Sequence, residues 1–212
     1  MAGTTPLTIG ADAACTDGAC GKVIRLVVDP RARTVTHLVV NDRQLHGRLV
    51  PLDLVDVDVT TGQIRLSCAS AQLEKLHPAD VTVSLLNNDA DPENRNDQLF
   101  LYSLGRVLLD PPSATYNTLP SGEVAVRGGD HVHAADGTIG QIQGLVIDPD
   151  SRHVTHVLLQ EGHVLGRKVV AIPIGAVTGV NQNGIQLNLT KQQVKDLPSA
   201  YRRGSAPPRT QN

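Results

Sequence analysis

The chain repeats itself at a constant spacing, and this duplication constrains its fold more than any other feature. The matching segments are DGACG at 17–21 with DGTIG at 136–140, LVVDP at 26–30 with LVIDP at 145–149, and VTHL at 35–38 with VTHV at 154–157. All three pairs have the same offset of 119 (136 − 17, 145 − 26 and 154 − 35). A fixed offset of this kind indicates a tandem duplication of one small module.

The duplication predicts a domain organisation for the 212 residues. We expect repeat 1 in residues 1–80, a linker in 81–122, repeat 2 in 123–200 and a disordered tail in 201–212. A module of roughly 75 residues buries only a modest core, so each repeat should be marginally stable alone. The aromatic residues lie between or after the repeats, so both cores must be built from aliphatic side chains.

Each repeat reads as a series of short β-strands separated by turn residues. In repeat 1 the strands are expected at 22–28, 34–40 and 63–66, and repeat 2 copies them. Short helices are expected at 70–76 and 190–197, where Ser70 or Thr190 could cap the start and a proline follows the end. The prediction is an all-β fold: two small antiparallel barrels in tandem, each with a short C-terminal helix, joined by a partly flexible linker.

Composition narrows the function classes. The formal net charge of −2 argues against a general nucleic-acid-binding protein. No apolar run approaches the ~18 residues of a membrane-spanning helix, and the first residues lack the pattern of a secretory signal. Three cysteines do not suggest a disulfide-built secreted fold. We therefore expect a cytoplasmic protein without a membrane span.

The repeated motifs resemble those of the PRC-barrel family. The resemblance rests on Asp-Gly-x₂-Gly, Leu-Val-Val/Ile-Asp-Pro, Val-Thr-His-Leu/Val and, in repeat 2, Ala171-Ile172-Pro173-Ile174. In repeat 1 the last motif aligns with Pro51-Leu52-Asp53-Leu54, which places Asp53 where repeat 2 has a proline. The chain looks like tandem PRC-barrel proteins of actinobacteria, often called stress-associated. The resemblance implies a PRC-type β-barrel with no catalytic centre and no cofactor, which positions other proteins.

Cys15 and Cys20 are the candidate redox pair. If Asp17 and Gly18 form a two-residue hairpin loop, Cys15 faces Cys20 across the strands at a distance near the lower limit for a disulfide. Repeat 2 has Ala134 and Ile139 at these positions, so the barrel itself does not need the thiols. A reversible bridge and two inert, partly buried thiols both remain open interpretations. The pair alone makes a weak metal site.

Other candidate interaction residues are polar or aromatic. His131 and His133 alternate along an expected strand and share a face, where a metal or a pH-sensing patch is conceivable. Arg48 and Arg167, each after a glycine, are candidate contacts for RNA or an acidic partner. Phe100 and Tyr102 belong to an apolar stretch at 98–110 of the linker, which we expect to dock on a barrel or a second subunit.

Three hypotheses about function follow. The first is a non-enzymatic protein-binding scaffold or adaptor, which binds a partner or a second copy of itself through strand edges, rim loops and the apolar part of the linker. The second is a ribosome- or RNA-associated assembly factor, disfavoured by the acidic balance and the lack of aromatic platforms. The third is a redox- or metal-responsive regulator that uses the cysteines or histidines.

Overall fold

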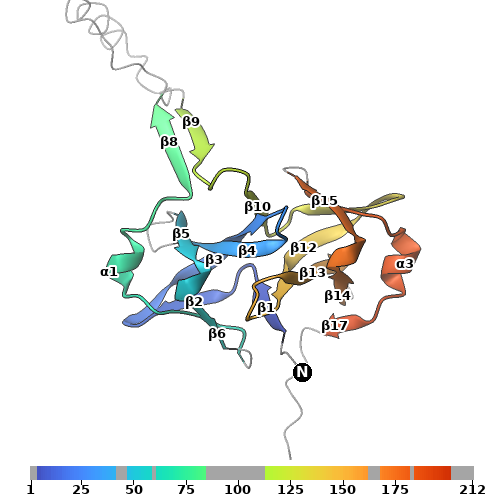
Figure 1. Cartoon of the computed structure of the whole chain (residues 1–212), viewed down its shortest axis with the longest axis horizontal. Coiled ribbons are helices and arrows are strands. Elements are labelled where there is room, and N and C mark those ends of the chain that lie inside the picture. Colours follow the sequence, from blue (N-terminus) through green and yellow to red (C-terminus); the bar gives the residue numbers. More distant parts are fainter. Residues whose placement is uncertain are drawn as a thin grey trace, which may run out of the picture. The chain divides into compact units, whose positions relative to one another are not determined.

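The structure is a computed structural model that describes residues 4–41, 47–58, 61–84, 113–161, 168–181 and 184–201 (Figure 1). Several sequence predictions fall outside this part of the chain. They are the flexible linker with its apolar stretch at 98–110, Phe100, Tyr102, Arg167 and the tail beyond residue 201.

Repeat 1 supplies most of a seven-stranded sheet, in the order β5–β4–β3–β2–β7–β6, with β10 paired to β3. The strands are β2 (Asp12–Cys15), β3 (Gly18–Asp29), β4 (Thr34–Asn41), β5 (Gly47–Pro51), β6 (Val55–Val57), β7 (Ile64–Leu66) and β10 (Val124–Arg127). A 3₁₀ helix, η1 (Leu52–Leu54), connects β5 to β6, and the helix α1 (Ser70–Leu73) follows β7.

Repeat 2 supplies most of an eight-stranded sheet, in the order β15–β16–β11–β12–β13–β14–β17, with β1 paired to β12. The strands are β1 (Thr5–Thr8), β11 (His131–Ala134), β12 (Gly137–Ile147), β13 (Val154–Glu161), β14 (Lys168–Pro173), β15 (Val177–Asn181), β16 (Gly184–Leu187) and β17 (Ser199–Tyr201). The 3₁₀ helix η3 (Ile174–Ala176) and the helix α3 (Lys191–Lys195) correspond to η1 and α1.

The predicted all-β architecture with two barrel-like sheets is confirmed, but the sheets are mixed rather than wholly antiparallel. β2 pairs with β7 in parallel, and β11 pairs with β16 in parallel. Four intervening strands separate the members of each pair along the chain, which is the long connection that a parallel pairing requires.

Each repeat gives its first strand to the sheet of the other repeat. β1 pairs with β12, with Thr5 opposite Ile147, whereas β10 pairs with β3, with Val124 opposite Val28. These pairings are possible because β3 and β12 are long: β2 and β11 cover only their first halves and leave an edge open for the exchanged strand. The sequence boundaries at 80 and 123 therefore do not separate the two sheets.

The described residues of 1–77 and 119–212 accordingly form one compact unit. A second unit, in 78–118, contains the antiparallel pair β8 (Asp80–Ser84) and β9 (Ser113–Asn117), so both ends of the expected linker are strands. No helix in the described part of the chain combines the length and apolar character needed to cross a membrane.

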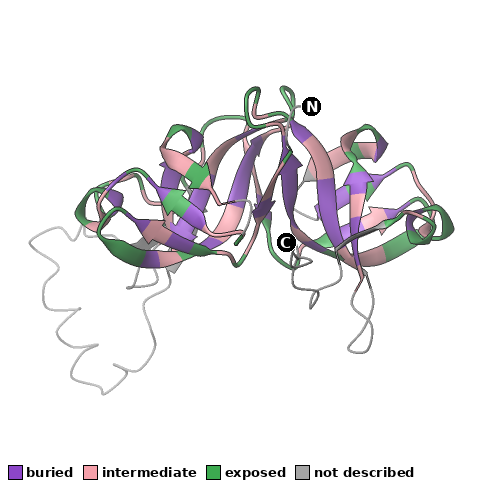
Figure 2. Ribbon diagram, turned by 90° about the horizontal axis from the view of Figure 1, so that it is seen from below, coloured by how far each residue is buried: buried purple, intermediate pink, exposed green. Residues whose placement is uncertain are grey.

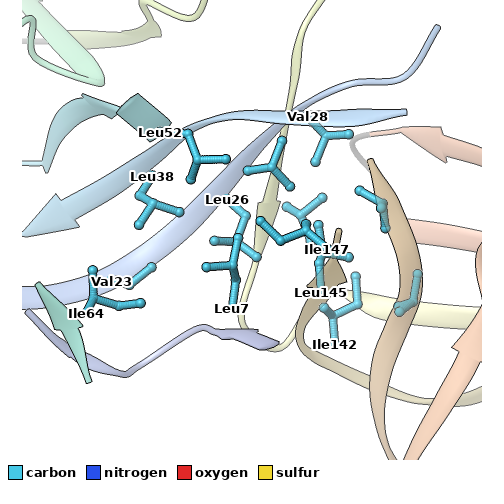
Figure 3. Close-up of a cluster of buried hydrophobic side chains, with 14 of the residues drawn as sticks. Leu7, Val23, Leu26, Val28, Leu38, Leu52, Ile64, Ile142, Leu145 and Ile147 are labelled. Carbon is cyan, nitrogen blue, oxygen red and sulfur yellow. The ribbon is translucent and has the colours of Figure 1, made fainter. Parts of the chain in front are cut away.

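The core is aliphatic, as the distribution of aromatic residues predicts. Buried positions concentrate on the strands of both repeats, and exposed positions on the turns (Figure 2). Leu7 of β1 is only 1% exposed and lies between Leu26 of repeat 1 and Leu145 of repeat 2 (Figure 3). The exchanged strand therefore joins the cores of the two repeats into one apolar cluster.

The short helices are fastened to their sheets by one apolar side chain within each helix and one just beyond it. Leu73 and Val194 are buried, while Leu76 and Leu197 are half-buried and pack against the same core. Thr190 caps α3, because its Oγ1 accepts a hydrogen bond from the Gln193 amide at 3.3 Å. The expectation of a Ser70 cap is wrong: Ala69 occupies the N-cap position of α1, and Ser70 is the first helical residue.

Candidate functional site

The predicted opposition of Cys15 and Cys20 across a hairpin is wrong. The loop residues are Thr16 and Asp17, so Cys15 lies opposite Gly18, and the pairing shifts at a β-bulge between Ala13 and Ala14. A bulge places two residues of one strand against one of its partner, and it changes which side chains face each other. A single sequence does not reveal such a shift in register.

Cys15 and Cys20 nevertheless meet, together with the third cysteine of the chain. The thiol of Cys15 interacts with those of Cys20 and Cys68, and all three are buried and unbridged. Cys68 follows β7, and its carbonyl accepts a hydrogen bond from the Thr16 amide at 3.1 Å, which holds it beside the β2–β3 hairpin. The sequence did not single out Cys68, because it lies 48 residues beyond Cys20 (68 − 20).

The environment of this thiol cluster opposes ionisation. Burial, reinforced by the neighbouring Cys20 thiol and the negative charge of Asp17, raises the pKa of Cys15 to about 12. Burial also raises the pKa of Cys20 and of Cys68. Because the thiolate is the reactive form, the folded cluster is poorly nucleophilic at neutral pH.

Repeat 2 provides an internal comparison for the thiol cluster. The Ala135 amide donates to the Leu189 carbonyl just as the Thr16 amide donates to the Cys68 carbonyl, so Leu189 is the equivalent of Cys68. With Ala134 and Ile139 in place of Cys15 and Cys20, the same site in repeat 2 is wholly apolar. Within the described residues, no group of three or more His, Cys, Asp or Glu side chains is placed to hold a metal ion.

The histidines lie as the alternation predicts. His131 is exposed and His133 is half-buried, both on the face of β11 opposite the buried Val132, and their ring centroids are 6.3 Å apart. His133 Nδ1 lies 3.2 Å from Thr138 Oγ1. The structure thus brings the two rings to one face, without a carboxylate or thiol completing a metal site among the described residues.

Arg48 has a structural contact that its sequence context did not indicate. It lies within β5, half-buried, and its Nη1 donates a hydrogen bond to the Leu76 carbonyl at 3.3 Å, just beyond α1. The register pairs Val40 with Arg48 and the equivalent Leu159 with Val170, so Val170, not Arg167, is its counterpart. Arg167 itself lies outside the described residues.

The alignment of Asp53 with Pro173 is also wrong. His37 pairs with Pro51 and the equivalent His156 pairs with Pro173, so the offset grows from 119 (156 − 37) to 122 (173 − 51). Pro51 and Pro173 both precede a 3₁₀ helix. The proline is therefore retained in both copies, and Asp53 corresponds to Gly175 inside that helix.

The remaining shared motif residues build the fold. Asp17 accepts hydrogen bonds from the amide and hydroxyl of Ser70, and Asp136 accepts one from the Lys191 amide at 2.8 Å, so each turn holds the start of its helix. A Cβ at Gly21 would lie 1.7 Å from the Asn41 carbonyl oxygen, so only glycine allows the close backbone approach at this position. These structural contacts account for the presence of the same motif residues in both repeats.

A local two-fold relationship governs the junction of the repeats. The Val35 amide donates to the Arg152 carbonyl at 3.1 Å, and the equivalent Val154 amide donates to the Arg33 carbonyl at 2.8 Å. Arg33 and Arg152 both adopt left-handed backbone conformations, with φ of 54° and 60°. Such conformations are unfavourable for arginine and persist where surrounding contacts fix them, as these reciprocal hydrogen bonds do.

Two pockets of equal size lie at this junction. Each has a volume of about 280 Å³, and equivalent elements line them: an end of β3 or β12, an exchanged strand, and a 3₁₀ helix with the strand that follows it. Equivalent lining residues are Val28 and Ile147, Arg33 and Arg152, and Val177 and Val55. We call the one with Arg33 the apolar junction pocket and the one with Arg152 the acidic junction pocket.

The two pockets differ in charge. Asp53 and Asp56 line the acidic junction pocket, and the Arg152 guanidinium forms an ion pair with Asp53 there. In the apolar junction pocket Thr178 replaces Asp56, and Arg33 is the charged residue of the described lining. Gly175, the counterpart of Asp53, is exposed on η3 and lies outside that lining. One feature of the sequence indicated this site: arginine recurs at positions 33 and 152, which are separated by the repeat offset.

Comparison with known proteins finds no family model that matches the chain and no matching curated protein.

Proposed function

We propose that the protein is a non-enzymatic scaffold built from two PRC-type barrels, which binds a protein partner at the outer edge of β15. The shared motifs support the non-enzymatic part of this proposal, because their residues have structural roles: they make turns, hold helices and allow close strand packing. The strand exchange supports a rigid scaffold, because the two sheets share one core.

The observation that carries the proposal is the difference between the two terminal strands. β15 ends its sheet and pairs only through β16 in the described part of the chain. Its equivalent β6 also ends its sheet, but it has three residues and carries the exposed Asp56 at its centre. Short edges, charged side chains and β-bulges protect a sheet from added strands. β15 has a bulge between Val177 and Gly179, but it is longer than β6 and carries no charged residue.

A partner segment would therefore add to β15 as a further strand. In this mode backbone hydrogen bonds provide affinity, and pockets for alternate side chains provide specificity. The apolar junction pocket is lined by Val177, Thr178 and Val180 of the same strand, so side chains of the added segment would have an apolar surface beside it.

Site-specific photo-crosslinking in cells tests this proposal, with a benzophenone amino acid at position 178 and, as the matched control, at position 56. We expect a discrete adduct from position 178 and none from position 56. An adduct of twice the chain mass would identify the partner as a second copy. Absence of an adduct at 178, or equal adducts at both positions, would contradict the proposal.

The thiol cluster supports a second candidate function, a redox-responsive regulator. The supporting observation is that all three cysteines of the chain converge in one buried cluster. With hydrogen peroxide as oxidant, two thiols would form one disulfide and the peroxide would be reduced to two waters. Counting thiols by mass spectrometry after peroxide treatment of the folded protein tests this function: one thiol remaining of three supports it, and three remaining rejects it.

A further inference from the structure

We propose that the apolar junction pocket binds an aliphatic carboxylate, with the alkyl chain in the pocket and the carboxylate on Arg33. The inference goes beyond the scaffold function and does not depend on it. It rests on a comparison of the two pockets, which have the same backbone framework and differ at a few side chains.

The acidic junction pocket already contains the interaction that we assign to a ligand in the other. There the guanidinium of Arg152 is bound by the carboxylate of Asp53, a side chain of η1. The two residues are 99 positions apart in the chain, so the fold and not local sequence brings them together. An arginine at this position can therefore receive a carboxylate presented from the 3₁₀ helix.

The apolar junction pocket has no counterpart of this carboxylate: Gly175 lies on η3 next to the lining residue Ile174, exposed and outside the lining itself. Gly175 occupies the position of Asp53, and a Cβ built on Gly175 would meet no atom within 4 Å. Arg33 makes no ion pair with any residue that the structure describes. A ligand carboxylate can thus take the place that the Asp53 carboxylate takes in the other pocket.

The backbone of Arg33 is fixed by the fold. The Arg33 carbonyl accepts the hydrogen bond from the Val154 amide, and this contact holds the residue in its left-handed conformation at the junction. Arg33 is exposed, so its guanidinium is accessible to a ligand from solvent.

The rest of the pocket selects for a hydrocarbon chain. Its lining is mainly aliphatic, with Val28, Val126, Leu145, Val157 and Ile185 among the residues that form it. Its volume of about 280 Å³ is roughly twice that of an engineered apolar cavity of about 150 Å³ that binds benzene. A chain of about eight carbons is therefore of suitable size, and apolar walls with one cation define its chemical class.

Octanoate is the probe, added to the full-length chain labelled with ¹³C at its methyl groups. We expect the methyl signals of Val126, Val177 and Ile185 to shift, with a Kd of about 1 mM or below. Octan-1-ol should bind more weakly, because it lacks the charge. Failure of octanoate to shift these methyl groups at concentrations up to about 10 mM, or equal binding of octan-1-ol, would overturn the proposal.

Substitutions that exchange features between the pockets sharpen the test. Arg33→Gln should weaken octanoate binding about 1.4- to fivefold, the range for an exposed ion pair. Gly175→Asp should weaken it by a similar factor, because the new carboxylate on η3 would pair with Arg33 as Asp53 pairs with Arg152. Arg152→Gln, in the acidic junction pocket, is the matched control and should leave binding unchanged.

Folding is checked for each variant by cooperative unfolding in urea, so a loss of binding is not confused with a loss of structure. Equal octanoate affinity of a folded Gly175→Asp variant and the original chain would overturn the proposal. Octanoate binding and the crosslink at position 178 are separate readouts, so one can fail while the other succeeds.

Discussion

Thr34 and His153 form an antiparallel β-bridge with each other, although they are the same position in the two repeats. A residue can pair with its own equivalent only where a two-fold relationship passes between them. The hydrogen bonds that flank this bridge are reciprocal in the same way. The duplication has therefore produced an internal counterpart of a symmetric dimer, in which each half completes the other.

The first prediction concerns the independence of the repeats. Alone, a fragment of residues 1–77 or 119–212 would leave the open half of β3 or β12 without its exchanged strand. We expect neither fragment to unfold cooperatively as a monomer, and an equimolar mixture to regain the β-sheet circular dichroism of the intact chain. Cooperative unfolding of either monomeric fragment alone would contradict the shared core.

The second prediction concerns Leu7, which is 1% exposed between the two repeats. Leu7→Ala should lower the free energy of unfolding by about 2–5 kcal/mol, because it leaves a cavity in the joint core. Lys22→Ala is the control: it removes only an exposed ion pair with Asp12 and should cost at most about 1 kcal/mol. Urea unfolding measures both, and similar losses would argue against a buried β1.

The third prediction concerns the aspartates of the repeated turns. Asp17→Ala removes the acceptor of the Ser70 amide and hydroxyl, and it should destabilise the fold by about 0.5–2 kcal/mol, as loss of a helix cap does. Asp136→Ala should have an effect of the same kind, through the Lys191 amide. Thermal unfolding of both variants measures this effect. An unchanged Tm in either variant would show that its aspartate does not stabilise the fold.

The fourth prediction concerns pH and the thiol cluster. The pKa of Cys15 is about 12 in the folded chain against an ordinary 9.0, so the unfolded chain loses this proton first as pH rises. The stability that the protonated thiol contributes is fully present below about pH 9 and is lost progressively between pH 9 and 12. The combined variant Cys15→Ala, Cys20→Ile, Cys68→Leu copies repeat 2 and should unfold with a smaller alkaline loss. An unchanged alkaline loss, measured by urea unfolding from pH 8 to 11, would contradict a buried protonated cluster.

Local features of the fold were readable from the sequence, because turn chemistry and aliphatic runs act over a few residues. The strands β3 and β4 and the cap of α3 at Thr190 follow from such local rules. Strand exchange does not, since Leu7 would satisfy the same hydrophobic pattern against either sheet. The constant offset showed that the repeats are equivalent but not which of them each strand would join.

The candidate sites depend on contacts distant in sequence. The turn at Thr16 and Asp17 places Cys15 opposite Gly18 rather than Cys20, and Cys68 joins the two cysteines from the segment that follows β7. Three extra residues before β14 moved Asp53 from a proline position to the position of Gly175. Only with the correct alignment does the difference between the two junction pockets become visible.

Interstrand nuclear Overhauser effects of the first strand test the exchange most directly. In the exchanged fold Thr5 lies beside Ile147 and Val124 lies beside Val28. In an unexchanged fold the equivalent contacts would join Thr5 with Val28 and Val124 with Ile147. We predict backbone cross-peaks for the first set in the isotopically labelled chain, and cross-peaks for the second set in their place would contradict the account.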